Sequence, residues 1–237
     1  MSTFIDQNYR YELKFEMNMK IAQLLKHRLS LFMDIDEFSK NEDGSYYVRS
    51  LYFDDIYDKA YYEKIDGVEE REKYRIRFYN FDENYIILEI KGKKGNLGYK
   101  EQDRINKEEC LFLIDGDCDK INIGSRKVLE RFVNDMKMKH LVPSVIVDYN
   151  RLAFTYPIAD VRITFDSDIA SGGYNYDFFN KDIMLYNILE DNKVILEVKY
   201  NDFLPKMICD LINGVPAVRI SMSKFALCKE KKGDRLC

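Results

Sequence analysis

Apolar and polar residues alternate along much of this chain, which is the pattern of β-strands with two different faces. In residues 9–15, four aromatic or aliphatic side chains fall on one face, whereas Arg10, Glu12 and Lys14 fall on the other. The same alternation predicts further strands over residues 46–53, 73–78, 86–91, 100–104, 145–154, 161–168, 194–200 and 218–227.

Three segments repeat apolar residues with a helical period instead, at 17–32, 107–139 and 202–213. The glycine-rich segment 92–98 between two predicted strands is typical of a hairpin loop. No linker, internal repeat or low-complexity stretch interrupts this order. We therefore expect a single domain over residues 1–237, with its core at about 9–228.

Composition narrows the class of protein. Of the 237 residues, 46% are hydrophobic, which is typical of a globular rather than a disordered chain. The net charge of -4 argues against a protein that coats nucleic acid or anionic membrane. The odd number of cysteines (5) argues against a disulfide framework and favours reduced thiols. Residues 1–8 have no apolar core, so we expect no signal peptide there. No apolar run reaches the ~20 residues of a membrane span. We expect a cytoplasmic protein.

The polar faces of the predicted strands repeat Arg and Lys with Glu interspersed: Arg10/Lys14, Arg75/Arg77, Glu89/Lys91, Lys100/Arg104, Arg151, Arg162 and Glu197/Lys199. Two arrangements fit this pattern. The charged faces could form the outside of a sheet or sandwich, where ion pairs contribute little to stability. Alternatively, the sheet closes into a barrel whose charged faces line a polar lumen, and the amphipathic helices cover its apolar outside.

A lumen lined by like charges would repel itself unless anions bind there. Phosphate chains are the natural candidates, because Arg binds phosphate oxygens in a bidentate way and Lys acts as a point charge. Glu89 and Glu197 would then be metal ligands, since hard divalent cations take carboxylate oxygens and bridge phosphates. The pattern alone leaves both arrangements open.

Eight short strings, none of them specific alone, occur in the order found in one family. They are RYELK (10–14), SLYFD (50–54), KYRIR (73–77), LEIK (88–91), YNR (149–151), VRITFD (161–166), LEVK (196–199) and SKF (223–225). In these strings the chain resembles the VTC domain, the polyphosphate polymerase module of the triphosphate tunnel metalloenzyme (CYTH-like) superfamily. The resemblance extends over nearly the whole chain, from about residue 9 to 228.

This resemblance implies an α+β, mainly β fold: a closed antiparallel β-barrel forming a basic tunnel, with helices packed on its outside. It also implies an ATP-dependent polyphosphate polymerase, which transfers the γ-phosphoryl of ATP to a polyphosphate chain with Mn²⁺ or Mg²⁺. ATP and inorganic polyphosphate would be the partners, without nucleic acid. Translocation of the product would need a membrane-associated partner, because the chain has no membrane span of its own.

Carried over by position, the resemblance implies three sets of site residues. The catalytic cations would be Arg75, Arg77, Lys91, Arg151, Arg162 and Lys199. Further phosphate-binding residues would be Lys14, Lys100, Arg104, Ser223 and Lys224. The metal ligands would be Glu197 and Glu89. Arg104 and Glu89 are included because strand alternation places them on the faces that would line the lumen.

The chain departs from the family pattern in two places. The hydrolase branch carries E-x-E-x-K on its first strand, but here Arg10 stands before Glu12 and Lys14, which favours the polymerase branch. Ser221 replaces a lysine of the VTC pattern, and Arg219 on the same strand face is a candidate to compensate. A tripolyphosphate or nucleoside triphosphate hydrolase and a non-catalytic polyphosphate-binding module stay open as alternatives. Metal preference, acceptor and oligomeric state are not determined by the sequence.

Overall fold

The computed structural model describes residues 9–39 and 41–233. Residues 1–8, for which we expected no signal peptide, lie outside this part of the chain, and so does Cys237. Cys110, Cys118, Cys209 and Cys228 are free thiols. In the described part, no helix is long and apolar enough to cross a membrane.

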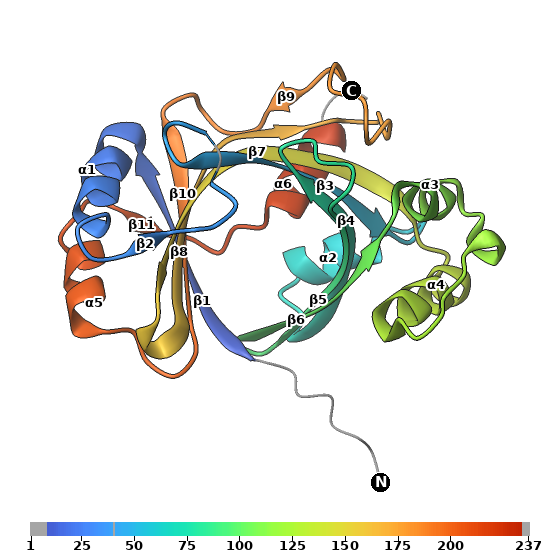
Figure 1. Cartoon of the computed structure of the whole chain (residues 1–237), viewed down its shortest axis with the longest axis horizontal. Helices are drawn as coiled ribbons and strands as arrows, with labels where there is room; N and C mark the ends of the chain where they lie inside the picture. Colours follow the sequence, from blue (N-terminus) through green and yellow to red (C-terminus); the bar gives the residue numbers. More distant parts are fainter. Residues whose placement is uncertain (1–8, 40, 234–237) are drawn as a thin grey trace, which may run out of the picture.

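The described chain is mainly an antiparallel β-sheet. Its strands are β1 (Arg10–Asn18), β2 (Asp34–Ile35), β3 (Ser45–Asp54), β4 (Glu70–Tyr79), β5 (Ile86–Lys94), β6 (Leu97–Ile105), β7 (Val142–Tyr156), β8 (Val161–Ser171), β9 (Tyr186–Asn187), β10 (Lys193–Tyr200) and β11 (Val218–Arg219). Neighbouring strands pair in a ring of order β7-β3-β4-β5-β6-β1-β10-β8, and β8 pairs with β7 again (Figure 1). The β6–β1 seam is the shortest in this ring, with Arg10 opposite Gly98 and Tyr11 opposite Leu97.

Helices cover two outer faces of this ring. The helices of the described chain are α1 (Met19–Leu29), α2 (Lys59–Ile65), α3 (Lys107–Asp115), α4 (Lys127–Lys139), α5 (Lys206–Asn213) and α6 (Lys224–Gly233). Of these, α1, α3, α4 and α5 cover the outer faces, whereas α2 and α6 share a third apolar cluster with residues such as Tyr52, whose side chain lines the cavity. In Figure 1, α1 and α5 lie beside β1, β10 and β8, whereas α3 and α4 lie at the opposite side of the ring. Local sequence starts two of these helices, because the Asn18 side chain caps α1 and Asn106 forms a capping box with Glu109 at α3.

The apolar strand faces point outward and bury themselves under these helices. One cluster joins β4, β5 and β6 to α3 and α4, and it includes Ile76, Leu88 and Phe132. A second joins β1, β8 and β10 to α1 and α5, and it includes Leu25 and Leu196. The predicted alternation is therefore confirmed on these strands, with the polar set left to face the inside of the ring.

Two predicted elements differ in the structure. The helical segment 107–139 is two helices, since the chain turns at Gly116 and Gly124, both with positive φ. The predicted strand 218–227 is wrong beyond Arg219, because helix α6 begins at Lys224. The helix prevails there because it buries Phe225 and Cys228, spaced three residues apart, on one face.

The packing of α4 against the sheet yields a stability prediction. The ring of fully buried Phe132 lies 5.3 Å from that of Phe53 and 5.5 Å from that of Tyr74. Phe132→Ala should lower the free energy of unfolding by about 3–5 kcal/mol, because it leaves a cavity between helix and sheet. Met138→Ala, at an 81% exposed position of the same helix, should change it by less than about 0.5 kcal/mol. Urea unfolding followed by circular dichroism checks both, and equal effects would contradict this packing.

Candidate functional site

A cavity of about 620 Å³ lies inside the ring, and strongly charged side chains line it. Among the described residues its cations are Lys14, Lys64, Arg71, Lys73, Arg75, Arg77, Lys91, Lys93, Arg151, Lys199, Arg219 and Lys224. The carboxylates in its lining are Glu12 and Glu197. These side chains come from the inner faces of β1, β4, β5, β7 and β10, from α2, and from the segment that leads into α6. The excess of cations gives the cavity a positive potential, which suits an anion with several charges.

Most of the residues predicted from the sequence meet in this cavity. Its lining includes Lys14, Arg75, Arg77, Lys91, Arg151, Glu197, Lys199, Ser223 and Lys224. It does not include Glu89, Lys100, Arg104 or Arg162. Glu89 lies beneath Arg75, only 1% exposed, and Lys100 approaches it to 3.3 Å. These two residues therefore stand next to the cavity rather than in its wall.

Arg162 and Arg104 occupy a different end of the ring. Arg162 pairs with Asp36 at 2.5 Å and donates to the Tyr46 hydroxyl at 3.0 Å. Arg104 is exposed and stacks over the ring of Tyr85 at 4.6 Å. Both arginines have partners that keep them away from the cavity, so a phosphate-binding role for them stays a prediction that the geometry does not support.

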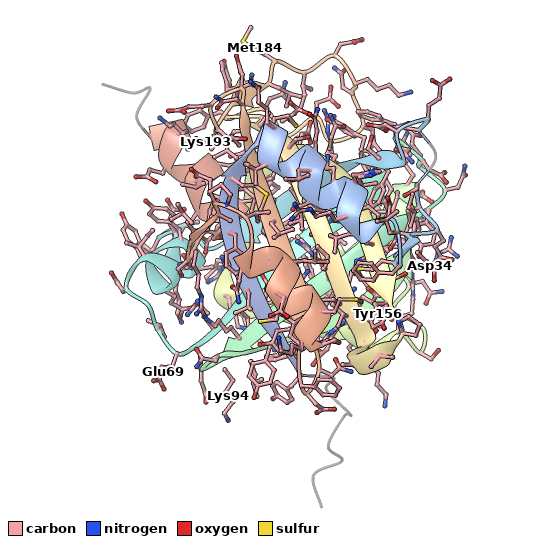
Figure 2. The ribbon with its side chains drawn as sticks, turned by 90° about the vertical axis from the view of Figure 1, so that its left-hand side faces the viewer. Asp34, Glu69, Lys94, Tyr156, Met184 and Lys193 are labelled. Atoms are coloured by element: carbon pink, nitrogen blue, oxygen red, sulfur yellow. The ribbon has the colours of Figure 1, made fainter. Side chains whose placement is uncertain are left out.

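The two ends of the ring differ in character. Figure 2 shows Glu69 and Lys94, next to or at the ends of β4 and β5, on the opposite side of the view from Asp34 and Tyr156. The cavity lining runs to the end that Lys93 and Asn96 occupy. Towards Asp34, aromatic rings fill the interior: Phe38 stacks on Tyr79 at 5.0 Å and also contacts Tyr46 and Tyr85.

Ion pairs hold the deepest cations of the cavity. Arg151 pairs with fully buried Asp166 through two bonds of 2.7 Å, and Lys224 lies 2.5 Å from the same carboxylate. Arg75 donates to Glu89 and, at 2.9 Å, to the Tyr52 hydroxyl. Such pairs offset the large cost of burying each charge alone. They also lock the guanidinium groups in one orientation before any ligand binds.

Arg77 differs because neutral groups hold it. Its Nε donates to Ser50 Oγ and its Nη2 to the Tyr149 hydroxyl, each at 2.9 Å, while Glu89 is 4.0 Å away. Tyr149 in turn carries cation–π contacts from Arg151 and Lys224 on its ring. Hydroxyl partners satisfy the donors of Arg77 without cancelling its charge, so it remains attractive to an anion.

Among the described carboxylates of the cavity, Glu197 has the largest number of cations around it. It lies 2.7 Å from Lys224, 3.5 Å from Lys14 and Lys199, and 3.9 Å from Arg151. Burial alone would raise the pKa of Glu197, but these four cations lower it well below its usual range. Glu197 is therefore ionised at neutral pH.

Glu12 is a site residue that the sequence interpretation did not select. Its oxygens lie 2.9 Å from Lys14 and 3.0 Å from Lys91, and these cations lower its pKa well below its usual range against the effect of burial. Asp166, Tyr52 and Lys73 were missed as well. Alternation placed Glu12 and Lys73 on the polar faces, but only the strand pairing shows that those faces enclose a cavity.

The cavity carboxylates can bind a divalent metal only if substrate phosphates supply further oxygen ligands. Among the described residues, no group of three His, Cys, Asp or Glu side chains is close enough to hold a metal ion by itself. Mg²⁺ and Mn²⁺ are commonly bound through one or two carboxylates while substrate phosphates supply other oxygens. Ionised Glu197, together with Glu12, fits that mode. Glu89 does not, because it lies outside the cavity lining beneath Arg75.

Comparison with known proteins identifies the family of the chain and shows which solved structures have a similar fold. The family model of the VTC domain matches residues 9–231. A search of curated proteins gave no match. Among solved structures, the PH1012 protein from Pyrococcus horikoshii OT3 is similar at 12% identity and TM-score 0.50, over 92% of this chain and 98% of that chain. A Bacillus halodurans protein named a "putative adenylate cyclase" is similar at 11% identity and TM-score 0.52, over 89% of each chain. At these identities the similarity shows the fold alone.

The environment of Lys199 predicts pH-dependent anion binding. Burial lowers the pKa of Lys199 to about 7, although Glu12 and Glu197 oppose the shift. A bound polyanion favours the ammonium form, so binding should take up a proton, and affinity should fall roughly tenfold between pH 6 and pH 8. In Lys199→Arg, which stays charged, this loss should disappear.

Isothermal titration with tripolyphosphate at pH 6, 7 and 8 measures the effect in wild type and Lys199→Arg. Protonation of the ligand itself is common to both proteins, so it cancels in the comparison. Identical pH dependence of the two proteins would show that Lys199 does not titrate in this range.

Proposed function

The chain belongs to the VTC domain family, and from that premise we propose that it is an ATP-dependent polyphosphate polymerase acting inside the cavity. The observation that carries the proposal is the excess of inner-face cations around a cavity of about 620 Å³. ATP and the growing polyphosphate chain are both polyanions that such a site can neutralise. In this proposal the ring of strands works as a closed barrel around the reacting phosphates.

The reaction needs alignment more than acid–base chemistry. A terminal phosphate oxygen of the acceptor chain forms a bond to the γ-phosphorus of ATP, and the bond from that phosphorus to the oxygen of ADP breaks. The attacking oxygen is already ionised, so no general base has to remove a proton. Catalysis then rests on positioning and on stabilising the charge of the transferred group.

The cavity residues suit these tasks. Arg77 presents a guanidinium whose charge no close carboxylate cancels, and Arg75 and Arg151 are held rigid by Glu89 and Asp166. Lys91 and Lys199 add point charges at the wall, beside Glu12 and Glu197. A divalent metal held by Glu197 and Glu12 would add positive charge at the phosphate oxygens.

One observation favours a second candidate, a triphosphate hydrolase. Glu12 and Glu197 both line the cavity, so two carboxylates of the kind that can hold metal or orient water face the same space. A hydrolase would use water rather than a phosphate chain as acceptor. The two activities differ in their products, which makes them separable by one assay.

The assay incubates the purified protein with ATP and Mn²⁺ or Mg²⁺ and resolves the products by chain length. Long polyphosphate chains with stoichiometric ADP are the expected result. Orthophosphate without chains would reject polymerisation in favour of hydrolysis. Binding of polyphosphate without turnover under either metal would leave a binding module.

Glu197→Gln should separate binding from catalysis. Loss of the carboxylate removes a metal ligand but also removes negative charge from beside Lys14, Lys199 and Lys224. Turnover should fall on the order of 10²-fold or more, whereas tripolyphosphate affinity should be kept or increase. Glu42→Gln, at an exposed loop position, is the control and should change neither quantity. Full turnover in Glu197→Gln would refute the metal-binding role.

A further inference from the structure

Like charges stand directly opposite one another on the inner face of β4 and β5. Arg71 pairs with Lys93 in the strand register, and Lys73 pairs with Lys91 two residues further along. The next pair on this face, Arg75 with Glu89, has opposite charges. Like charges at directly opposed positions destabilise an antiparallel pair. The two repulsive pairs therefore cost stability in the absence of a ligand.

The cations at this end have no carboxylate within ion-pair distance among the described residues, unlike those deeper in the ring; Glu63 acts on Arg71 and Glu12 on Lys93 only from farther away. We call Lys64, Arg71, Lys73 and Lys93 the mouth cluster. Lys73 donates to Ser223 Oγ at 2.8 Å, Arg71 to the Val68 carbonyl, and Lys64 to the Ser221 carbonyl at 3.2 Å. Within residues 9–39 and 41–233, no carboxylate forms an ion pair with any member of the mouth cluster.

Three elements bring the mouth cluster together. Lys64 comes from α2, Arg71 and Lys73 from β4, and Lys93 from β5, and all four line the cavity without being fully exposed. Burial and the neighbouring cations lower the pKa of Lys73 well below its usual range. Mutual repulsion of this kind is relieved when an anion binds among the cations.

The geometry also defines the path of a long ligand. From the Arg75–Glu89 pair to the Arg71–Lys93 pair is four residues along the strand, or roughly 13 Å at about 3.3 Å per residue. At the other end of the ring, Phe38, Tyr46 and Tyr79 occupy the interior. A polyanion seated on Arg75 and Arg77 therefore extends outward through the mouth cluster. A triphosphate at those arginines reaches Lys73, two residues from Arg75, but is too short to reach the Arg71–Lys93 pair.

We propose that the mouth cluster is a second polyanion subsite, which holds the outer part of a polyphosphate chain and makes the protein select long chains over triphosphates. This inference rests on the proposed function, because it assumes that the deep cations hold phosphates. It assigns a role to Lys64, Arg71 and Lys93, which lie outside the eight family strings, and to Lys73, which begins the string KYRIR. The substrate class is a linear polyphosphate long enough to contact both groups of cations.

The test is the double variant Arg71→Gln/Lys93→Gln. Isothermal titration compares its affinity for tripolyphosphate and for polyphosphate of several tens of units with that of wild type. Affinity for the long chain should fall about tenfold or more, the equivalent of about 1.4 kcal/mol, whereas tripolyphosphate affinity should change less than about twofold. The melting temperature without ligand should be unchanged or higher, since a repulsive pair is removed.

Lys127→Gln/Lys206→Gln is the matched control, because it removes the same net charge at exposed positions of α4 and α5. It should bind both ligands as wild type does. Equal losses for both ligands, or no loss for the long chain, would overturn the subsite while leaving the proposed function standing. If wild type binds neither ligand, the proposed function fails and the subsite fails with it.

Discussion

The structure depends on one electrostatic constraint: cations buried inside a ring of strands must be neutralised. Protein carboxylates do so for the deepest of them, through the pairs Arg151–Asp166 and Arg75–Glu89 and through the lysines around Glu197. Removing one member of such a pair would leave a buried charge without compensation, at a cost of about 3–5 kcal/mol. Farther out, the compensation stops, and the remaining positive charge is available to a ligand.

The apolar half of the same strands explains the helices. On β1, β4, β5, β8 and β10, alternation gives one polar and one apolar face, so enclosing the polar faces forces the apolar faces outward. Helices α3 and α4 cover β4, β5 and β6, and helices α1 and α5 cover β1, β8 and β10. The acidic residues that bring the net charge to -4 need not face the cavity; many, such as Glu42 and Glu130, are exposed elsewhere. A net negative protein thus encloses a positive interior.

Membership of the VTC domain family indicates chemistry on phosphate chains, and the shape and charge of the cavity bear on the length of the chain it takes. Aromatic residues around Phe38 lie at one end of the ring, and the other end carries an excess of cations, among them Arg71, Lys73 and Lys93. A ligand that enters and leaves by the same end presents its free terminus to solvent there. In the proposed subsite, this asymmetry relates chain length directly to the number of cations in contact.

Sequence alone determined most of the strands through period-two alternation and the family through eight ordered motifs, because both are local properties. Alternation left open whether the charged faces point inward, which only the family resemblance implied. The sequence correctly brought together Arg75, Arg77 and Arg151, which lie on separate strands but share one inner face. It could not show that Arg162 and Arg104 turn to Asp36 and Tyr85, since strand tilt and register decide which end of the ring each residue reaches. Only the tertiary structure decided that α6 replaces a strand at Lys224, and that like-charged Arg71 and Lys93 stand opposite each other. Both depend on contacts between segments far apart in the chain, which no local pattern encodes.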